Sequence, residues 1–529
     1  MNGAVDGNGR AEGNGEGLSV VARGGARSVA PACVAVYLAV VLGLLVAIFD
    51  RDRGVFTYTL DDPYIHLALA QSLAHGHYGI NAGEASSPSS SVVWPFLLTP
   101  FAGWAWGVYL PLAWNVVFCG MAAWGIGRFV DGWRERAGWA ERFAVACALM
   151  LVGNLAGLTF VGMEHGLQVL LAIACAVGMA EAYRGRVVPG WCLCAAALGP
   201  MVRYENFALV VAVGIALCGQ GRVRGAVRLV AVSLVGPVLF SVLLVSRGLP
   251  ALPTSVLVKA RVYAVAGSAA SEVMRTPVVR EWTWWGLLAV LGVLVWLAVR
   301  EKERRWVLAG TMVAAVLQLA AGRFNWFHRY EVYAVVFCAM VAAMALVERV
   351  HAPVWGVTLG LLVLAWPYEQ AVWETPAAAS NVYEQQWQMG RFEREFYGKT
   401  VAVNDLGSVS YRRPSGADVV DLWGLGSPEA ARQAVKDGDW MDAITQAHGA
   451  GLAMIYPDWF DEGAPDDWTP LATMCIAGER VSVSRECVVF YSTEVGDRAA
   501  LTAEVAAFAR TLPSEVRMTL GRDSTDEDE

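Results

Sequence analysis

Eleven runs of apolar residues, spread between residues 31 and 367, constrain the fold of this chain more than any other feature. Most have roughly the length that a helix needs to cross the hydrocarbon core of a bilayer, about 20 residues. Charged residues are 17% of the chain, against about 25% in soluble domains. The pattern predicts a polytopic α-helical membrane protein with about eleven spans, near 31–49, 108–127, 143–161, 166–182, 189–202, 206–218, 227–246, 283–299, 306–321, 331–347 and 353–367.

The region 189–218 has a second interpretation. Its two short runs flank "MVRYEN", so they could also form one span with a polar break.

Basic residues in the loops predict the orientation, because Lys and Arg concentrate on the cytoplasmic side. They fall in alternate loops, which predicts a cytoplasmic N-terminus, a C-terminus outside, and a multi-pass protein of the cytoplasmic (inner) membrane. The residues that set this pattern are Arg23, Arg27, Arg128, Arg134, Arg136, Arg142, Arg184, Arg186, Arg222, Arg224, Arg228 and the segment 300–305. No basic patch suggests a nucleic-acid partner.

The chain divides into four parts. Residues 1–30 are Gly-rich and polar, which predicts a disordered cytoplasmic segment. Residues 31–369 form the transmembrane core, with a first outer loop at 50–107. Residues 370–515 predict an extracytoplasmic α/β domain, because strand-like "TVAVND", "ADVVDL" and "LAMIY" alternate with helical stretches such as "SPEAARQAVKDGDWMDAITQAHGA". Residues 516–529 are expected to be an acidic tail.

Two of the ten cysteines, Cys475 and Cys487, lie in this C-terminal part. Outside the cytoplasm they could form a disulfide across a hairpin. Two unrelated free thiols are the alternative.

Adjacent carboxylates open the first outer loop in "LDDPYIHLALAQSLAH". Pro63 marks a helix start, and Ile65, Leu69 and Leu73 form one apolar stripe, so a short helix lying along the membrane interface is expected. In the simplest interpretation Asp62 caps this helix and Asp61 is a solvated neighbour. Alternatively, the pair acts as a general base on a hydroxyl, or binds a divalent cation such as Mg²⁺ or Mn²⁺.

Cations gather on the same predicted side as the acid pair. Each one alone also suits a side chain that reaches from the membrane to water. As a set they could neutralise a lipid-linked phosphate; they are Arg203, Lys259, Arg261, Arg323, His328 and Arg329.

Five stretches, in this order, resemble motifs of GT-C membrane glycosyltransferases that use polyprenyl-phosphate sugars, such as mycobacterial arabinofuranosyltransferases and related mannosyltransferase-like enzymes. They are "LDDPYIHLALAQSLAHGHYGINAGEASSPSSSVVWP", "VGMEHGLQVLL", "LGPMVRYENFALV", "RGLPALPTSVLVKARVY" and "VAVNDLGSVSYRRPSGADVVDLWGLGSPE". Together they span about residues 55 to 430.

The resemblance implies an inverting sugar transfer from a polyprenyl phosphate to a hydroxyl of an envelope glycan, lipid or protein. It implies that Asp61 is the base, while Asp62 caps the helix, assists or holds a metal, and that Lys259 binds the phosphate. Residues expected near the acceptor are Glu164, His165, Glu205 and Tyr64. Arg203 and Glu205 could instead be a buried ion pair that fixes helix packing.

This chain departs from the family pattern at three motifs. Arg203-Tyr204-Glu205 replaces Arg-Pro-Glu, Pro253-Thr254-Ser255 replaces Pro-Asn-Thr, and "MEHG" replaces "META". The departures leave the sugar and the acceptor open.

Four further polar residues favour structural roles. His66, His75 and His77 have a spacing that fits a metal, but turn and interface roles are favoured, and Asp405 in "NDLG" suits a turn after a strand.

Two other functional classes remain open. One is a transporter or flippase of lipid-linked saccharides, which would show mid-span charges or an inverted repeat. The other is a non-catalytic envelope assembly protein, in which the acid pair would be dispensable.

Overall fold

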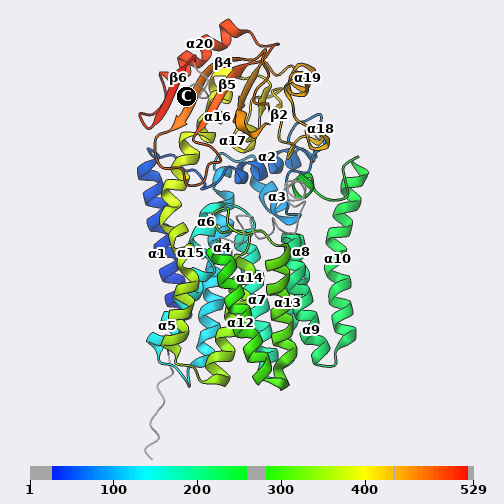
Figure 1. Cartoon of the computed structure of the whole chain (residues 1–529), viewed down its shortest axis with the longest axis vertical. Coiled ribbons are helices and arrows are strands. Elements are labelled where there is room, and N and C mark those ends of the chain that lie inside the picture. The colour runs from blue at the N-terminus through cyan, green and yellow to red at the C-terminus, as the bar shows by residue number, and fades with distance from the viewer. Residues whose placement is uncertain (1–26, 259–280, 434, 461, 522–529) are drawn as a thin grey trace, which may run out of the picture.

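A computed structural model describes residues 27–258, 281–433, 435–460 and 462–521. Lys259 and Arg261 lie outside these residues, as do most of the segment 1–30 and the end of the acidic tail. The molecule consists of a helical bundle and a C-terminal domain with a β-sheet, and a layer of short helices lies between them (Figure 1).

Helices coincide with all eleven predicted apolar segments. Within the described residues, seven helical segments are long and apolar enough to cross a membrane. The region 189–218 forms two helices, because Arg203 between them has an extended backbone (φ −154°). The bundle comprises α1 (Ala30–Arg51), α4 (Leu110–Val130), α5 (Trp139–Val152), α6 (Leu155–Val161), α7 (His165–Tyr183), α8 (Gly190–Val202), α9 (Phe207–Gly219), α10 (Val223–Ser246), α12 (Trp282–Arg300), α13 (Arg305–Ala321), α14 (Val332–Ala345) and α15 (Val354–Glu384).

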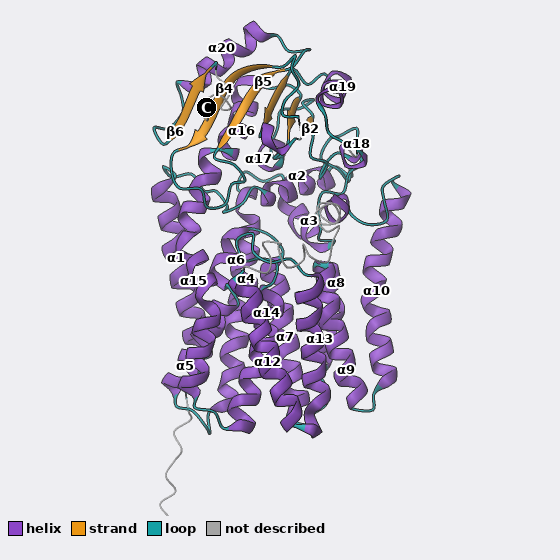
Figure 2. Ribbon diagram, in the orientation of Figure 1, coloured by secondary structure: helices purple, strands orange, loops and turns teal. Residues whose placement is uncertain are grey.

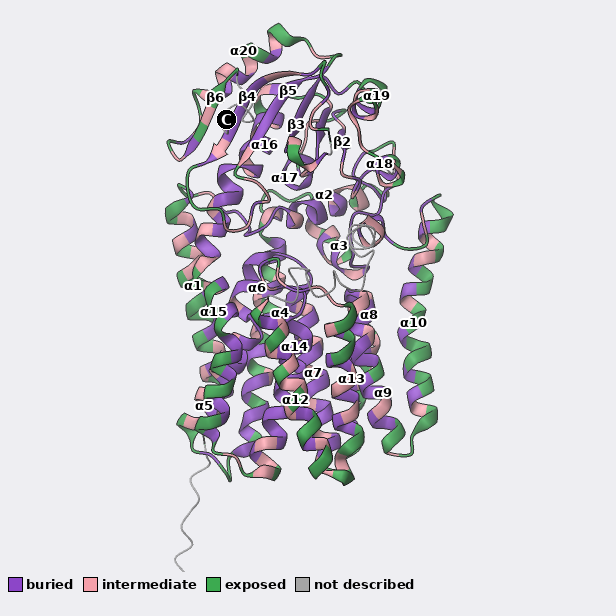
Figure 3. Ribbon diagram, in the orientation of Figure 1, coloured by how far each residue is buried: buried purple, intermediate pink, exposed green. Residues whose placement is uncertain are grey.

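The surroundings of each bundle helix follow from how its apolar residues are distributed. α14 is apolar on all sides, and every one of its residues is buried, as expected for a central helix. α1 and α10 instead leave Leu and Val side chains exposed, among them Leu42 and Leu239 (Figure 3). These exposed faces suit contact with lipid.

The first loop contributes α2 (Asp62–Ala74) and α3 (Val93–Leu98), which lie between the bundle and the C-terminal domain (Figure 2). The sequence predicts that α2 lies along the interface with one apolar face. In the structure α2 is buried on two faces: Tyr64 and Leu67 pack into the bundle core, while Ile65 and Leu69 pack with residues of the C-terminal domain. The stripe with Ile65 and Leu69, expected to face the membrane, thus contacts the C-terminal domain instead, and the side chains of Tyr64 and Leu67 pack on the bundle.

The C-terminal domain is built on a six-stranded sheet with the order β2-β1-β3-β5-β4-β6. The first three strands in this order are parallel and the last three antiparallel, and Val401 of β1 pairs with both Val419 and Leu452. The strands are β1 (Val401–Val403), β2 (Val419–Asp421), β3 (Leu452–Ile455), β4 (Thr469–Ile476), β5 (Cys487–Ser492) and β6 (Val516–Leu520). The helices are α16 (Gln386–Phe392), α17 (Gly407–Ser410), α18 (Pro428–Arg432), α19 (Gly438–His448) and α20 (Arg498–Ala509).

Domain boundaries differ from the expected ones in two places. α15 continues without interruption through the expected boundary at 369/370 to Glu384. β6 forms the edge of the sheet at residues 516–520, where the sequence suggested the start of an acidic tail.

The helical stretch expected after Ser427 is two helices, and each has its own side-chain cap, from Ser427 and from Asp437.

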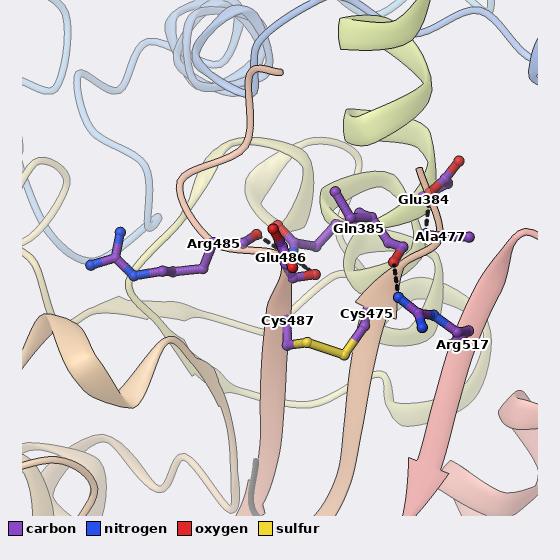
Figure 4. Close-up of a disulfide and its surroundings, with 9 residues drawn as sticks. Glu384, Gln385, Cys475, Ala477, Arg485, Glu486, Cys487 and Arg517 are labelled. Atoms are coloured by element: carbon purple, nitrogen blue, oxygen red, sulfur yellow. Dashed lines mark hydrogen bonds between the residues drawn. A yellow bond between two sulfur atoms is a disulfide. The ribbon is translucent and has the colours of Figure 1, made fainter. Parts of the chain in front are cut away.

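A disulfide joins Cys475 of β4 to Cys487 of β5, which are paired across the two strands (Figure 4). The hairpin is also fastened to the end of α15. Gln385 Nε2 donates to the carbonyl oxygens of Arg485 and Glu486, and the backbone N–H of Ala477 donates to the Glu384 carboxylate. These bonds tie the sheet to the helix that enters the membrane.

Candidate active site

Asp61 and Asp62 lie where the layer of short helices meets both larger parts of the molecule, and their surroundings differ. The Asp61 side chain points into the C-terminal domain. Its Oδ2 accepts a hydrogen bond from the backbone N–H of Gly407 (2.6 Å), and its Oδ1 accepts one from the N–H of Ser408 (2.8 Å). Asp61 is 8% exposed and occupies the N-cap position of α2 without capping it. The sequence placed the cap one residue later, at Asp62.

Burial raises the pKa of Asp61 well above its ordinary value, and the negative charge of Asp405 raises it further. The two amide hydrogen bonds from Ser408 and Gly407 oppose this shift. A carboxyl group in this setting is enclosed and already occupied by donors. It is poorly placed to receive an acceptor hydroxyl.

Asp62 points to the bundle side and its side chain is 23% exposed. Arg329 Nη1 donates to Asp62 Oδ2 at 3.0 Å, and the Arg329 side chain is only 2% exposed. The ion pair fixes the orientation of Asp62 while part of its side chain stays exposed to solvent. Of the two acids, Asp62 is therefore the one that a second molecule can reach.

Three arginines surround the ring of Tyr330. The guanidinium carbons of Arg329, Arg203 and Arg323 lie 4.9, 5.3 and 5.8 Å from the ring centroid. Arg329 Nη2 also donates to the Tyr330 hydroxyl at 2.9 Å. Cations over the face of an aromatic ring are attracted by its quadrupole, so Tyr330 holds three positive charges close together.

Arg203 links this cluster to two glutamates. It forms two hydrogen bonds with Glu205, at 3.2 and 2.8 Å, and one of 2.8 Å with Glu164. Glu164 is fully buried, and its second oxygen lies 3.7 Å from His66 Nε2. The Arg203–Glu205 pair expected from the sequence is present, although the Glu205 side chain is 33% exposed. Arg203 also lies beside Tyr330.

The loop that carries Arg329 and Tyr330 has an unusual backbone. Four consecutive non-glycine residues, Asn325–His328, have positive φ between 51° and 65°. Such conformations cost of order 1–3 kcal/mol each and cluster at functional sites.

Glu331 helps to hold this turn. It is fully buried, and its carboxylate accepts hydrogen bonds from the Asn325 backbone N–H (3.0 Å) and from His328 Nδ1 (3.2 Å). Burial alone would lower the pKa of His328, but the hydrogen bond and the charge of Glu331 outweigh burial and raise it. His328 therefore has a greater tendency to be cationic than a free histidine.

Asp405 follows β1 in the C-terminal domain and lies near the acid pair on the side away from the bundle. Its carboxylate accepts hydrogen bonds from Gln386 Nε2 (2.9 Å) and from the Tyr456 hydroxyl (3.2 Å). Burial raises the pKa of Asp405, and the charge of Asp62 adds to the shift, although Gln386, Asp61 and Tyr456 oppose it. The position expected from the sequence to be a plain turn is therefore part of a cluster of three carboxyl groups.

Of the other residues named from the sequence, some lie beside Tyr330 or the acid pair and others do not. His165 is buried and its ring lies 5.9 Å from that of Tyr330. Tyr64 is buried against Tyr58 and Tyr411. His75 and His77 bind backbone carbonyls of the first loop instead.

Within the described parts of the chain, no three His, Cys, Asp or Glu side chains are grouped to hold a metal ion. Four residues of the site lie outside the motifs found in the sequence, namely Tyr330, Glu331, Gln386 and Tyr456. Gly407 and Ser408 lie within the last motif, but nothing in it marked their backbone N–H groups.

The structure is that of a multi-pass helical membrane protein with a C-terminal domain that carries a sheet. Residues 379–491 match a family model described as a domain of unknown function (DUF8728). No curated protein sequence matches the chain.

Two solved structures resemble the chain over most of its length. One is the Archaeoglobus fulgidus oligosaccharyltransferase in complex with Zn and sulfate, at 9% identity and a TM-score of 0.47, covering 92% of this chain and 74% of that one. The other is ArnT from Cupriavidus metallidurans in the apo state, at 13% identity and a TM-score of 0.46, covering 90% of this chain and 99% of that one.

Proposed function

We propose that this protein is a GT-C-type membrane glycosyltransferase. It moves a sugar from a polyprenyl-phosphate donor to a hydroxyl of an envelope glycan, glycolipid or protein, on the outer face of the cytoplasmic membrane. The observation that carries the proposal is the partly open Asp62 carboxylate, paired with Arg329 at a cluster of three arginines. An inverting transfer needs a base and a site for a departing phosphate next to each other, and this arrangement supplies both.

Asp62 is the general base in this proposal. The acceptor hydroxyl attacks C1 of the donor sugar, the bond between C1 and the phosphate oxygen breaks, and the hydroxyl proton passes to Asp62. The electron pair of the broken bond leaves on the polyprenyl phosphate, and the new glycosidic bond forms with inversion. The sequence resemblance favours Asp61 for this role. Asp62 is preferred here because Asp61 is buried and both of its oxygens accept backbone amides.

Cations beside Asp62 stabilise the negative charge that develops on the leaving phosphate. Arg323 and His328 lie on the loop that also carries Arg329, and the raised pKa of His328 favours its cationic form. Lys259 and Arg261 remain a prediction from the sequence for the same role. Arg203 contributes positive charge while Glu164 and Glu205 hold it in place.

The C-terminal domain covers α2 and borders the acid pair, so the acceptor approaches along this domain. Glu164 and His165 are proposed to shape the acceptor side through Arg203 and Tyr330, which they adjoin. A divalent cation is not required by this scheme.

A comparison of strains tests the proposal. A strain without the gene receives wild type, Asp62→Asn or the control Asp50→Asn, an exposed acid at the end of α1. With membrane levels matched, the linkages of the envelope glycans are compared. We expect one linkage to vanish on deletion, to return with wild type and the control, and to stay absent with Asp62→Asn.

A transporter makes a different prediction in purified form. Protein in vesicles, with labelled polyprenyl-phosphate sugars extracted from the host, should transfer label to acceptor and release polyprenyl phosphate. Movement of the intact lipid-linked sugar between leaflets, without cleavage, would refute the glycosyltransferase proposal.

A further inference from the structure

The C-terminal domain contains a segment that the structure brings into the acid site. We propose that the segment Asp405–Ser408 belongs to the catalytic centre, and that Gly407 is a positioning residue that sets the place of Asp61 and, through it, of Asp62. This inference rests on the proposed function.

The contact between the two parts is direct and involves main-chain groups. The N–H donors of Gly407 and Ser408 lie 346 and 347 positions from Asp61 in the chain, yet both reach its carboxylate. Each oxygen has its own amide donor, so the side chain is held at two points. Burying a carboxylate without such partners would be costly. The C-terminal domain can therefore pack over Asp61 only when both amide hydrogen bonds form.

Gly407 is required here for a steric reason. A Cβ atom at this position would come within 3.0 Å of the Asp61 backbone oxygen, Oδ2 and Cγ. Real Cβ atoms do not approach other atoms so closely, and one of the three contacts is with the backbone, which cannot rotate away. Any side chain at residue 407 must therefore displace Asp61 or the segment that carries residue 407, and either shift disturbs the contact between them.

A displacement of Asp61 reaches Asp62 through the start of α2. The Asp61 carbonyl accepts the hydrogen bond from the N–H of Tyr64 (3.1 Å) that begins this helix. Asp62 is the next residue and is bonded on its other side to Arg329 at 3.0 Å. Moving Asp61 while Arg329 stays fixed in the bundle changes the angle at which Asp62 meets a substrate.

The place of the segment in the sheet agrees with such a role. β1 lies between β2 and β3, all three parallel, and Asp405 follows the carboxyl end of β1. In open α/β sheets, ligand sites form at the carboxyl ends of strands, where connections leave to opposite sides. Here that edge of the sheet meets the acid pair of the first loop through Asp405 and Gly407.

The test compares Gly407→Ala with Gly478→Ala. Gly478 lies in the same domain, has open space where a Cβ would go, and is therefore a matched control. In purified full-length protein we expect Gly407→Ala to lower kcat about 100-fold, as expected for a displacement near 1 Å, with the KM for the lipid donor changed less than about twofold. Gly478→Ala should match wild type in both.

Asp61→Asn provides a second variant, with nearly unchanged volume, in case Gly407→Ala does not fold. Its amide nitrogen would face one backbone N–H, so one of the two bonds is lost. We expect a fall in kcat with an unchanged KM, measured on the folded protein, together with a lower thermal midpoint because one buried hydrogen bond is lost. A fall in stability with normal kcat in the folded fraction would overturn the inference.

The two proposals fail in different ways. If the purified wild type transfers no sugar, the proposed function fails. If Asp62→Asn keeps full transfer activity, the glycosyltransferase proposal stands but Asp62 is not the base. If Asp62→Asn is inactive while Gly407→Ala and Asp61→Asn both retain wild-type kcat, the glycosyltransferase proposal stands and the positioning role of Gly407 is wrong.

Discussion

Arg329 donates a hydrogen bond to Asp62 across 267 positions of sequence, and it does so from a site where its own side chain is almost completely buried. The pair joins the loop before α14 to the first turn of α2. It therefore connects a strained segment of the bundle to the acid that the proposed reaction depends on.

Replacing Arg329 should affect turnover more than folding. Asp62 is partly exposed, so water can solvate its carboxylate when the partner is lost. We expect Arg329→Gln to lower kcat on the order of 100-fold, since both the orientation of Asp62 and one cation near the phosphate are lost. Arg329→Lys should recover only part of the activity, because lysine cannot bond Asp62 and Tyr330 together. Steady-state kinetics and thermal unfolding of the same preparations check this prediction. A loss of thermal stability large enough to account for the loss of activity would contradict it.

The left-handed turn at Asn325–His328 predicts a ranking of substitutions at Trp326. Trp326 is 48% exposed with φ +52°, a conformation that glycine adopts without cost and β-branched residues resist. We expect Trp326→Gly to keep activity within about twofold and Trp326→Val to lose at least about tenfold, because the loop can no longer place Arg329. Transfer assays on both variants test the ranking. Equal activity of the two would show that the turn does not depend on its backbone strain.

Glu393 predicts a pH-dependent stability of the C-terminal domain. It is fully buried, neither carboxylate oxygen accepts a hydrogen bond within the described structure, and burial raises its pKa to about 7 against the opposing charges of Arg394 and Arg413. An acid whose folded pKa is raised is protonated in the folded state when the unfolded chain has already ionised. The free energy of unfolding therefore falls as pH rises from the ordinary value of 4.5 to about 7.

The expected size of this loss is about 3 kcal/mol, at about 1.4 kcal/mol per pKa unit. In Glu393→Gln the loss should be largely absent. Denaturant unfolding followed at several pH values compares the two proteins. A wild-type stability that rises over this interval, or the same slope in both proteins, would contradict the role of Glu393.

The disulfide predicts both a stability effect and a location. Closing the loop between Cys475 and Cys487, separated by 12 positions, should stabilise the protein by about 3 kcal/mol. We expect the double variant Cys475→Ser, Cys487→Ser to unfold at a lower temperature while retaining activity at 25 °C. In cells, the two thiols of the wild type should resist alkylation until a reductant is added, since disulfides persist outside the cytoplasm. Ready alkylation in untreated cells would place the domain on the cytoplasmic side.

The apolar runs predicted the bundle well because a membrane span must be long, apolar and internally hydrogen-bonded, and each requirement is visible locally. The C-terminal sheet was predicted only in part. β4 contains Pro470 and Ala472 and lacks the alternating pattern that marks a strand. β6 does alternate apolar and polar residues, but it is only five residues long and directly precedes the acidic tail.

The residues of the candidate site were also predicted only in part. Asp61, Asp62 and the Arg203–Glu205 pair could be found in the sequence because acids and cations are conspicuous near predicted span ends. Tyr330 could not, because its role depends on Arg203, which is distant in the sequence, meeting Arg323 and Arg329 of the loop that carries Tyr330. Gly407 and Ser408 act through backbone N–H groups, which carry no side-chain signature.

The contact between Asp61 and the amides of Gly407 and Ser408 also sets an order of events during biosynthesis. The acid pair enters the membrane early, whereas its two amide donors are synthesised about 350 residues later and must first cross the bilayer in the proposed topology. A newly inserted bundle therefore holds Asp61 without its partners and leaves the first loop unorganised. Under the proposed function, a chain becomes competent only once the last domain has folded, and unfinished chains do not consume the proposed lipid-linked donor.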